Sequence, residues 1–265
     1  MRTQEIVKQN LSVTVSDVRV WSHGIHAMLW YRIIVPAHDS SELLPVLYLL
    51  HGANSGPVDI VERSNVLSLA EKYRLIVVMP EAGYSYYTNA QHLKNARWED
   101  VTIDDLSRDV LANFPVKQRP RSAGIAGISM GGYGAAKLAL KYPEKFSFVG
   151  VMSGSLDITR RSPSIQRWSQ TERIWAIFGY LNRTRRKEDV FELLTPQTYP
   201  AVNFHWFNSC GEEDPLRPVN SRFVKALNEH GAASQMLLTA GGHDWQSWNI
   251  ALPMMFEAAS ETISP

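Results

Sequence analysis

The sequence predicts an α/β fold with a mostly parallel central sheet and helices on both of its faces. Residues 46–50, 75–79 and 148–152 are short, continuously apolar segments, as expected of strands that are buried on both faces. Apolar residues at helical spacing follow the first of these strands, at residues 60–73. Strands that alternate with helices indicate parallel pairing through right-handed crossovers.

The first elements of the chain are expected at one edge of this sheet. Residues 11–20 alternate apolar and polar side chains, the pattern of a half-buried strand, and residues 27–35 are rich in bulky and β-branched side chains. The short turn at residues 21–24 favours an antiparallel pair. The remaining elements are strands near residues 203–209 and 235–239 and helices near residues 106–114, 135–142, 219–230 and 248–260.

Residues 157–201 interrupt the alternation of strands and helices. Arg, Ser, Trp and Thr are mixed there with short apolar pieces. We expect this segment to be a cap-like insertion over the carboxyl edge of the sheet, within a single domain formed by residues 1–265. A chain of this length can bury one large core.

The composition narrows the expected partners and compartment. The formal net charge of +1 gives no reason to expect a nucleic-acid partner or an anionic membrane surface, and no apolar run approaches membrane-spanning length. Cys210 is the only cysteine, and the N-terminus carries no apparent signal peptide. His23 and His26 have no acid or cysteine cluster near them in the sequence, so no metal site is expected. We expect a cytoplasmic protein that binds neither nucleic acid nor a membrane, and the composition is compatible with a homo-oligomer.

The most informative motif is a glycine-rich turn around Ser129. Ser129 lies between Gly127 and Gly131 in a Gly-x-Ser-x-Gly pattern, with a short apolar run before it and a helix-like run after it. The nucleophile elbow of an α/β-hydrolase requires this order, because the glycines let strand and helix approach closely around a strained serine. A glycine-rich turn that only packs a helix against a sheet is the alternative. The motif predicts the α/β-hydrolase fold, with Ser129 as the catalytic nucleophile.

A serine nucleophile needs a base to take its proton and an acid to orient that base. In this fold the acid and then the histidine follow the serine along the chain, in loops after late strands. His243 follows the last predicted strand, and Asp214 follows the strand before it. We expect His243 to be the base and Asp214 the acid, while Glu212 or Glu213 could take the role of Asp214.

The oxyanion of the tetrahedral intermediate needs two aimed N–H donors. Met130 directly follows the serine, and Ala53 lies in the loop after the strand at residues 46–50, so their backbone N–H groups are the candidates. Candidate substrate contacts lie in the same loop or beside the catalytic edge, and they are Gly52, Asn54, Tyr87 and Trp245.

Seven segments of the chain resemble the esterase D family, in the family's order. They are Leu-Leu-His-Gly at 49–52, Met-Pro-Glu-Ala-Gly at 79–83, Gly-Ile-Ser-Met-Gly-Gly-Tyr-Gly at 127–134, Tyr-Pro-Glu-Lys-Phe at 142–146, Ser-Gly at 153–154, Cys-Gly-Glu-Glu-Asp at 210–214 and Gly-His-Asp-Trp-Gln-Ser-Trp at 242–248. The family includes S-formylglutathione hydrolases, tributyrin esterases, feruloyl and acetyl-xylan esterases, and mycolyltransferases. The resemblance implies the same roles for Ser129, His243, Asp214, Met130 and Ala53, with no cofactor and no metal.

Two segments depart from the family pattern. Met-Pro-Glu-Ala-Gly at 79–83 stands where many relatives have Pro-Asp-Gly-Gly, and residues 157–201 match no segment of the family. Both lie where substrate choice is usually made. We therefore predict a serine carboxylesterase that hydrolyses short-chain acyl esters or thioesters through an acyl-enzyme. The alternatives are an S-formylglutathione hydrolase or a feruloyl or acetyl-xylan type of esterase, followed by an acyltransferase and an inactive binding module.

Overall fold

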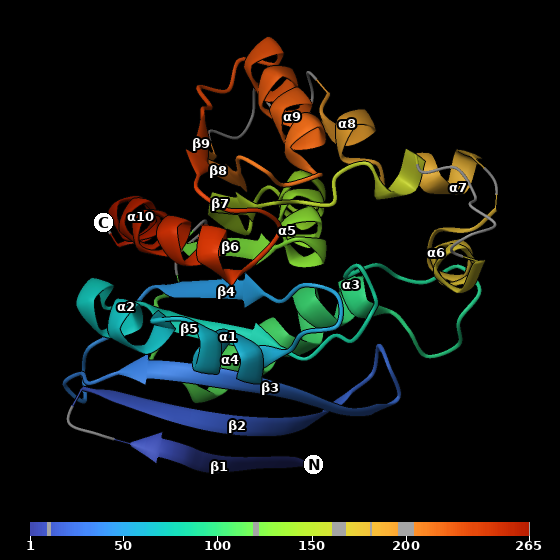
Figure 1. The fold of residues 1–265 in the computed structure, drawn as a ribbon. Helices are drawn as coiled ribbons and strands as arrows, with labels where there is room; N and C mark the ends of the chain where they lie inside the picture. Colours follow the sequence, from blue (N-terminus) through green and yellow to red (C-terminus); the bar gives the residue numbers. More distant parts are fainter. Residues whose placement is uncertain (10–11, 119–121, 161–167, 181, 196–203, 265) are drawn as a thin grey trace.

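A nine-stranded sheet forms the centre of the protein in the computed structural model (Figure 1). The structure describes residues 1–9, 12–118, 122–160, 168–180, 182–195 and 204–264. The strands follow the order β1-β2-β3-β5-β4-β6-β7-β8-β9 across the sheet. Antiparallel pairing joins β1 (Arg2–Gln9), β2 (Val13–Ser22), β3 (Ala27–Pro36) and β5 (Ile76–Pro80). Parallel pairing continues from β5 through β4 (Val46–Leu50), β6 (Ala123–Ile128), β7 (Phe146–Met152), β8 (His205–Gly211) and β9 (Met236–Thr239).

Helices cover both faces of this sheet. One apolar core lies between the sheet and α1 (Pro57–Arg63), α2 (Val66–Tyr73) and α10 (Trp245–Ile263). A second core lies on the other face, under η1 (Val101–Leu106), α4 (Ser107–Asn113), α5 (Met130–Lys141) and α9 (Arg217–Glu229). The predicted sheet with helices on both faces is confirmed. Within the described residues, no helix combines the length and the apolar character needed to span a membrane.

The structure differs from the predicted elements at two places near the N-terminus. The sequence does not predict β1, because seven of its eight residues are exposed and its pairing with β2 rests on the backbone. The helix expected at residues 60–73 is divided into α1 and α2. Ser64 causes the break, because its backbone is extended (φ −136°) and its hydroxyl donates to the Ile60 carbonyl oxygen.

The described parts of the segment 157–201 contain four helices. They are η2 (Ile158–Arg160), α6 (Trp168–Phe178), α7 (Asn182–Arg186) and α8 (Val190–Leu193). Residues 161–167, 181 and 196–201 of the segment lie outside the described residues. In Figure 1, α6 and α7 lie beyond the end of the sheet to which the β4 arrow points. The backbone N–H groups of Gln91 and His92 donate to carbonyl oxygens of α6, each at 2.9 Å, and tie this helix to the loop after β5.

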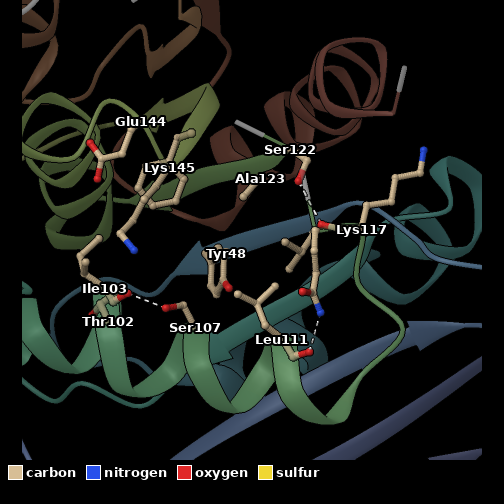
Figure 2. Close-up of a pocket in the computed structure, with 13 residues that line it drawn as sticks. Tyr48, Thr102, Ile103, Ser107, Leu111, Lys117, Ser122, Ala123, Glu144 and Lys145 are labelled. Atoms are coloured by element: carbon tan, nitrogen blue, oxygen red, sulfur yellow. Dashed lines mark hydrogen bonds between the residues drawn. The ribbon is translucent and has the colours of Figure 1, made fainter. Parts of the chain in front are cut away.

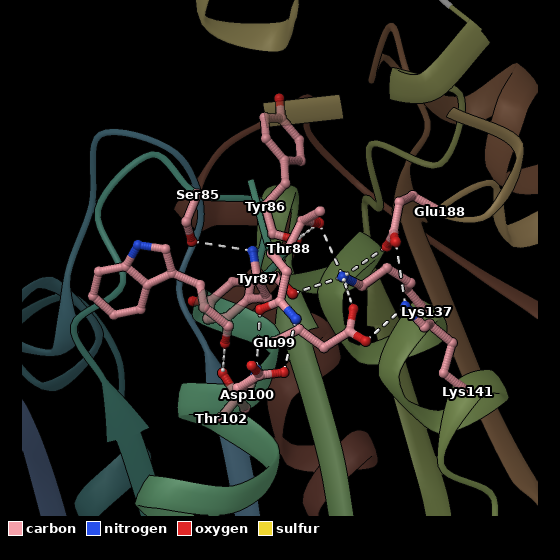
Figure 3. A network of polar contacts seen from close by, with 12 residues as sticks. Ser85, Tyr86, Tyr87, Thr88, Glu99, Asp100, Thr102, Lys137, Lys141 and Glu188 are labelled. Carbon is pink, nitrogen blue, oxygen red and sulfur yellow. Dashed lines mark hydrogen bonds and ion pairs between the residues drawn. The ribbon is translucent and has the colours of Figure 1, made fainter. Parts of the chain in front are cut away.

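A buried cluster of charges holds α5 in place (Figure 3). Lys137 of α5 is fully buried, and its ammonium lies 2.8 Å from Glu99 and 3.2 Å from Glu188. Lys141 lies one turn later on the same helix and pairs with the same two carboxylates, at 2.6 and 3.2 Å. Two ammonium groups therefore face two carboxylates. The cluster joins α5 to α3 (Trp98–Asp100) and to the turn before α8.

Candidate active site

Ser129 occupies a strained turn between β6 and α5. Its backbone has φ 57° and ψ −111°, a conformation that residues other than glycine rarely adopt. Three backbone hydrogen bonds fix it there: the Ser129 N–H donates to the Met152 carbonyl at 2.9 Å, and the Ser129 carbonyl accepts from Ser155 at 3.0 Å and Tyr133 at 3.1 Å. The surrounding structure thus holds the serine side chain at the carboxyl edge of the sheet.

Gly127 and Gly131 are required by the close approach of the segments around this turn. A Cβ atom at Gly127 would lie 2.3 Å from the Gly131 carbonyl, and one at Gly131 would lie 2.1 Å from the Leu50 carbonyl oxygen. Both contacts are with backbone, which cannot move aside as a flexible side chain could. Both positions of the motif therefore require glycine so that strand and helix can approach closely, as the sequence pattern predicts.

His243 and Asp214 form a hydrogen-bonded row with Ser129. The Nε2 atom of His243 lies 2.9 Å from the Ser129 Oγ atom, and its Nδ1 atom lies 2.9 Å from an oxygen of Asp214. The three residues come from three separate places at one edge of the sheet, after β6, after β8 and after β9. Glu212 and Glu213, the alternatives to Asp214, are exposed.

The surroundings of Asp214 keep its carboxylate ionised. Burial raises the pKa of Asp214, but the hydrogen bonds from His243 and from the Leu216 N–H, together with the polar Ser153 side chain, outweigh it and leave this pKa below its usual value. An ionised carboxylate can only accept a hydrogen bond, so the Nδ1 atom of His243 carries the proton. The Nε2 atom then has a free lone pair directed at the Ser129 hydroxyl.

Ser153 and Trp248 support this row, and the motif analysis did not assign them a role. The indole N–H of Trp248 donates to the Ser153 hydroxyl oxygen at 3.1 Å, and the Trp248 ring packs edge-on against the His243 ring with centroids 5.2 Å apart. The Ser153 side chain also contributes to the low pKa of Asp214. Its position directly after β7, the neighbour of β6, is the sequence signal that could have identified it.

The loop after β4 lies beside Ser129 and is fixed by His51. The buried His51 ring donates from Nδ1 to the Gly52 carbonyl at 2.7 Å, and its Nε2 accepts from the Ala82 N–H at 3.0 Å. Burial lowers the pKa of His51, which agrees with a neutral ring that both donates and accepts. A Cβ atom at Gly52 would lie 3.4 Å from the Ser129 Cβ. Gly52, the residue before Ala53, therefore lies directly beside the serine.

Met130 is the first residue of α5 and directly follows Ser129. Its N–H therefore has no acceptor within the helix and is free to bind an anion. The Met130 side chain is fully buried in the core, so only its backbone can face a substrate.

A cavity of about 320 Å³ adjoins the Ser129 and His243 side chains. Gly52, Ala53, Asn54 and Trp245, which the sequence placed near the substrate, line it together with Trp248. No described residue of α6, α7 or α8 lines this cavity. Among the residues that the structure describes, no cluster of His, Cys, Asp or Glu side chains could hold a metal ion.

The prediction that Tyr87 contacts the substrate is wrong. The Tyr87 side chain is fully buried and lies outside the cavity, and its hydroxyl donates to the His51 carbonyl at 3.1 Å. Its ring instead fills the space beside Gly134 of α5, where a Cβ atom would lie 2.6 Å from the ring. Tyr87 packs against the helix that carries the serine turn and does not line the cavity.

The chain is similar to proteins of known family and to solved structures. A family model described as "Putative esterase" matches residues 25–259. An acetyl esterase of Caldicellulosiruptor saccharolyticus is 29% identical over 233 residues, which cover 83% of this chain and 85% of that protein. The structure of fluorophosphonate-binding serine hydrolase F of Staphylococcus aureus is 22% identical and superposes with a TM-score of 0.82, covering 94% of this chain and 99% of that one.

An S-formylglutathione hydrolase of Agrobacterium tumefaciens gives a TM-score of 0.81 at 19% identity, covering 97% of this chain and 99% of that one. These solved structures share the α/β-hydrolase fold, so the predicted fold is confirmed. The resemblance found in the sequence is confirmed as well, because the family model spans most of the chain. The chain therefore belongs to this esterase family, and it is a carboxylic ester hydrolase.

Proposed function

We propose that the protein is a serine esterase that cleaves short-chain acyl esters or thioesters through an acyl-enzyme. Ser129 is the nucleophile, His243 the general base and Asp214 the acid that orients the imidazole. The observation that carries this proposal is the row of two 2.9 Å hydrogen bonds from Asp214 through His243 to the Ser129 hydroxyl. Such a row activates a hydroxyl that is otherwise a weak nucleophile.

The first half of the reaction forms the acyl-enzyme. The Ser129 oxygen attacks the ester carbonyl carbon while its proton passes to the Nε2 atom of His243. The backbone N–H groups of Met130 and Ala53 stabilise the resulting oxyanion. The ester bond then breaks, and the leaving alkoxide or thiolate takes the proton from His243.

The second half of the reaction releases the acid. His243 takes a proton from water, which attacks the acyl carbon, and the proton returns to Ser129 as the carboxylic acid leaves. Asp214 stays ionised throughout and stabilises the imidazolium that forms twice per cycle. The exposed Glu212 and Glu213 take no part in this scheme.

The cavity size favours a small acyl group. Its volume of about 320 Å³ lies at the lower end of the range of roughly 300–1,000 Å³ that is common for ligand sites. The rings of Trp245 and Trp248 pack edge-on, with centroids 5.3 Å apart, and form one wall. The relative from Caldicellulosiruptor saccharolyticus is an acetyl esterase, which also supports a small acyl group.

Replacement of the serine tests the proposed nucleophile. We expect Ser129→Ala to lower the kcat for p-nitrophenyl acetate by about 10⁴-fold or more, because no other group can form the acyl-enzyme. Ser155→Ala is the matched control, because its hydroxyl oxygen lies only 3.5 Å from that of Ser129. The control should keep most of the activity. Retained turnover in Ser129→Ala, or its loss in Ser155→Ala alone, would reassign the nucleophile.

A pair of amide substitutions tests the proposed acid. Asp214→Asn should lower kcat by roughly 10⁴-fold, because the amide can stabilise the wrong tautomer of His243 and cannot stabilise its imidazolium. Glu213→Gln, which removes a neighbouring exposed charge, should leave kcat within about twofold. Both are measured with p-nitrophenyl acetate at neutral pH. A large effect of Glu213→Gln with little effect of Asp214→Asn contradicts the assignment.

A substrate series tests the proposed acyl size. We expect kcat/KM to be highest for the p-nitrophenyl acetate and butyrate esters and to fall for the octanoate, because a cavity of about 320 Å³, at the lower end of the range for ligand sites, fits a short acyl group together with the leaving group better than a long one. S-formylglutathione, measured in parallel, reports on the thioester alternative. Faster turnover of the octanoate than of the acetate rules out the short-chain class.

A further inference from the structure

A second cavity, of about 270 Å³, lies where the parallel strands β4, β6 and β7 begin, at the end of the sheet away from Ser129 (Figure 2). Val46, Ala123 and Phe146 line it, and they are the first residues of β4, β6 and β7. Ser129 follows the other end of β6, and six strand residues at about 3.3 Å each separate the two places by roughly 20 Å. The cavity is therefore separate from the esterase site.

Tyr48 presents an unpartnered hydroxyl to this cavity. The residue is only 5% exposed, and its hydroxyl has no hydrogen-bond partner among the residues that the structure describes. Burial raises the pKa of Tyr48, so the hydroxyl keeps its proton and is available as a donor. The other hydroxyl side chains of the lining donate to backbone carbonyl oxygens: Thr102 to Trp98, Ser107 to Ile103 and Ser122 to Lys117.

Lys145 adds a positive charge to the same space. Figure 2 shows its ammonium directed toward the opening between Tyr48 and Ile103. Lys145 has no ion pair within the described part of the chain, whereas the second lysine of the lining, Lys117, donates to the Ser264 carbonyl at 2.6 Å. Glu144 is the one carboxylate among the described lining residues, and it is exposed. The interior thus offers a neutral donor and a cationic donor.

We propose that this cavity binds a small monocarboxylate with an apolar body. The carboxylate accepts a hydrogen bond from the Tyr48 hydroxyl and pairs with the Lys145 ammonium, because these are the two side-chain donors of the lining that have no partner among the described residues. The apolar body packs against Ile103, Leu111 and Phe146. The volume of about 270 Å³ exceeds the roughly 150 Å³ that encloses a benzene molecule, so a ring with its carboxylate fits.

The test uses 4-fluorobenzoate as the probe, with its affinity for the full chain measured by fluorine NMR. We expect Lys145→Met and Tyr48→Phe each to weaken binding by about tenfold, the value of one hydrogen bond to a charged group. The neutral 4-fluorobenzamide should bind at least about tenfold more weakly than the acid for the same reason. Lys225→Met, which removes an equal charge from a side chain that is 78% exposed on α9, is the matched control and should leave the affinity unchanged.

Tyr48→Phe is informative because it removes only an oxygen atom, one that no described residue hydrogen-bonds. The thermal unfolding midpoint of this variant should be equal to or above that of the unchanged protein, so weaker binding cannot be attributed to unfolding. Three results overturn the proposal: no binding of 4-fluorobenzoate, equal affinities in all variants, or an equal loss in Lys225→Met. Equal binding of the acid and the amide overturns the carboxylate class.

Discussion

The strained backbone of Ser129 is the constraint on which the rest of the site depends. A non-glycine residue at φ 57° costs free energy, and hydrogen bonds from and to Met152, Tyr133 and Ser155 offset that cost. The turn forms only because the glycine at position 131 allows the start of α5 to approach the Leu50 carbonyl. The same approach brings the loop after β4 next to the serine. The conformation of the Ser129 backbone therefore brings together the nucleophile, the Met130 N–H and the loop after β4 that lines the cavity.

The helix that follows the serine is held in place by buried groups that contact one of its faces, at Gly134 and Lys137. Lys137 lies about 10 Å along α5 from Met130, at 1.5 Å per residue. Its ion pairs with Glu99 and Glu188 are enclosed by protein, and removal of one partner of such a pair costs about 3–5 kcal/mol because the remaining charge is left buried. The Tyr87 ring packs beside Gly134 on the same helix. The position of the serine turn thus depends on contacts that lie well outside the cavity.

Much of this arrangement follows from local sequence rules, and the exceptions have physical reasons. Buried parallel strands and the Gly-x-Ser-x-Gly turn leave strong patterns, so the sheet and the placement of Ser129, His243 and Asp214 were predictable. β1 leaves no pattern, because its side chains are exposed and only its backbone pairs. The prediction for Tyr87 failed because an aromatic side chain near a loop can pack into the core as well as line a cavity. The hydrogen bonds of Ser153 depend on tertiary geometry that no local pattern encodes.

In the proposed reaction the hydroxyl of Ser129, activated by the imidazole of His243, becomes covalently acylated. Reaction with a fluorophosphonate followed by peptide mass spectrometry measures this directly, because the reagent forms a stable adduct only with an activated nucleophile. We expect one adduct per chain, on the peptide that contains Ser129, and its absence from the protein in which His243 is replaced by Ala. An adduct on another residue, or ester hydrolysis that continues after Ser129 is fully modified, would contradict the account.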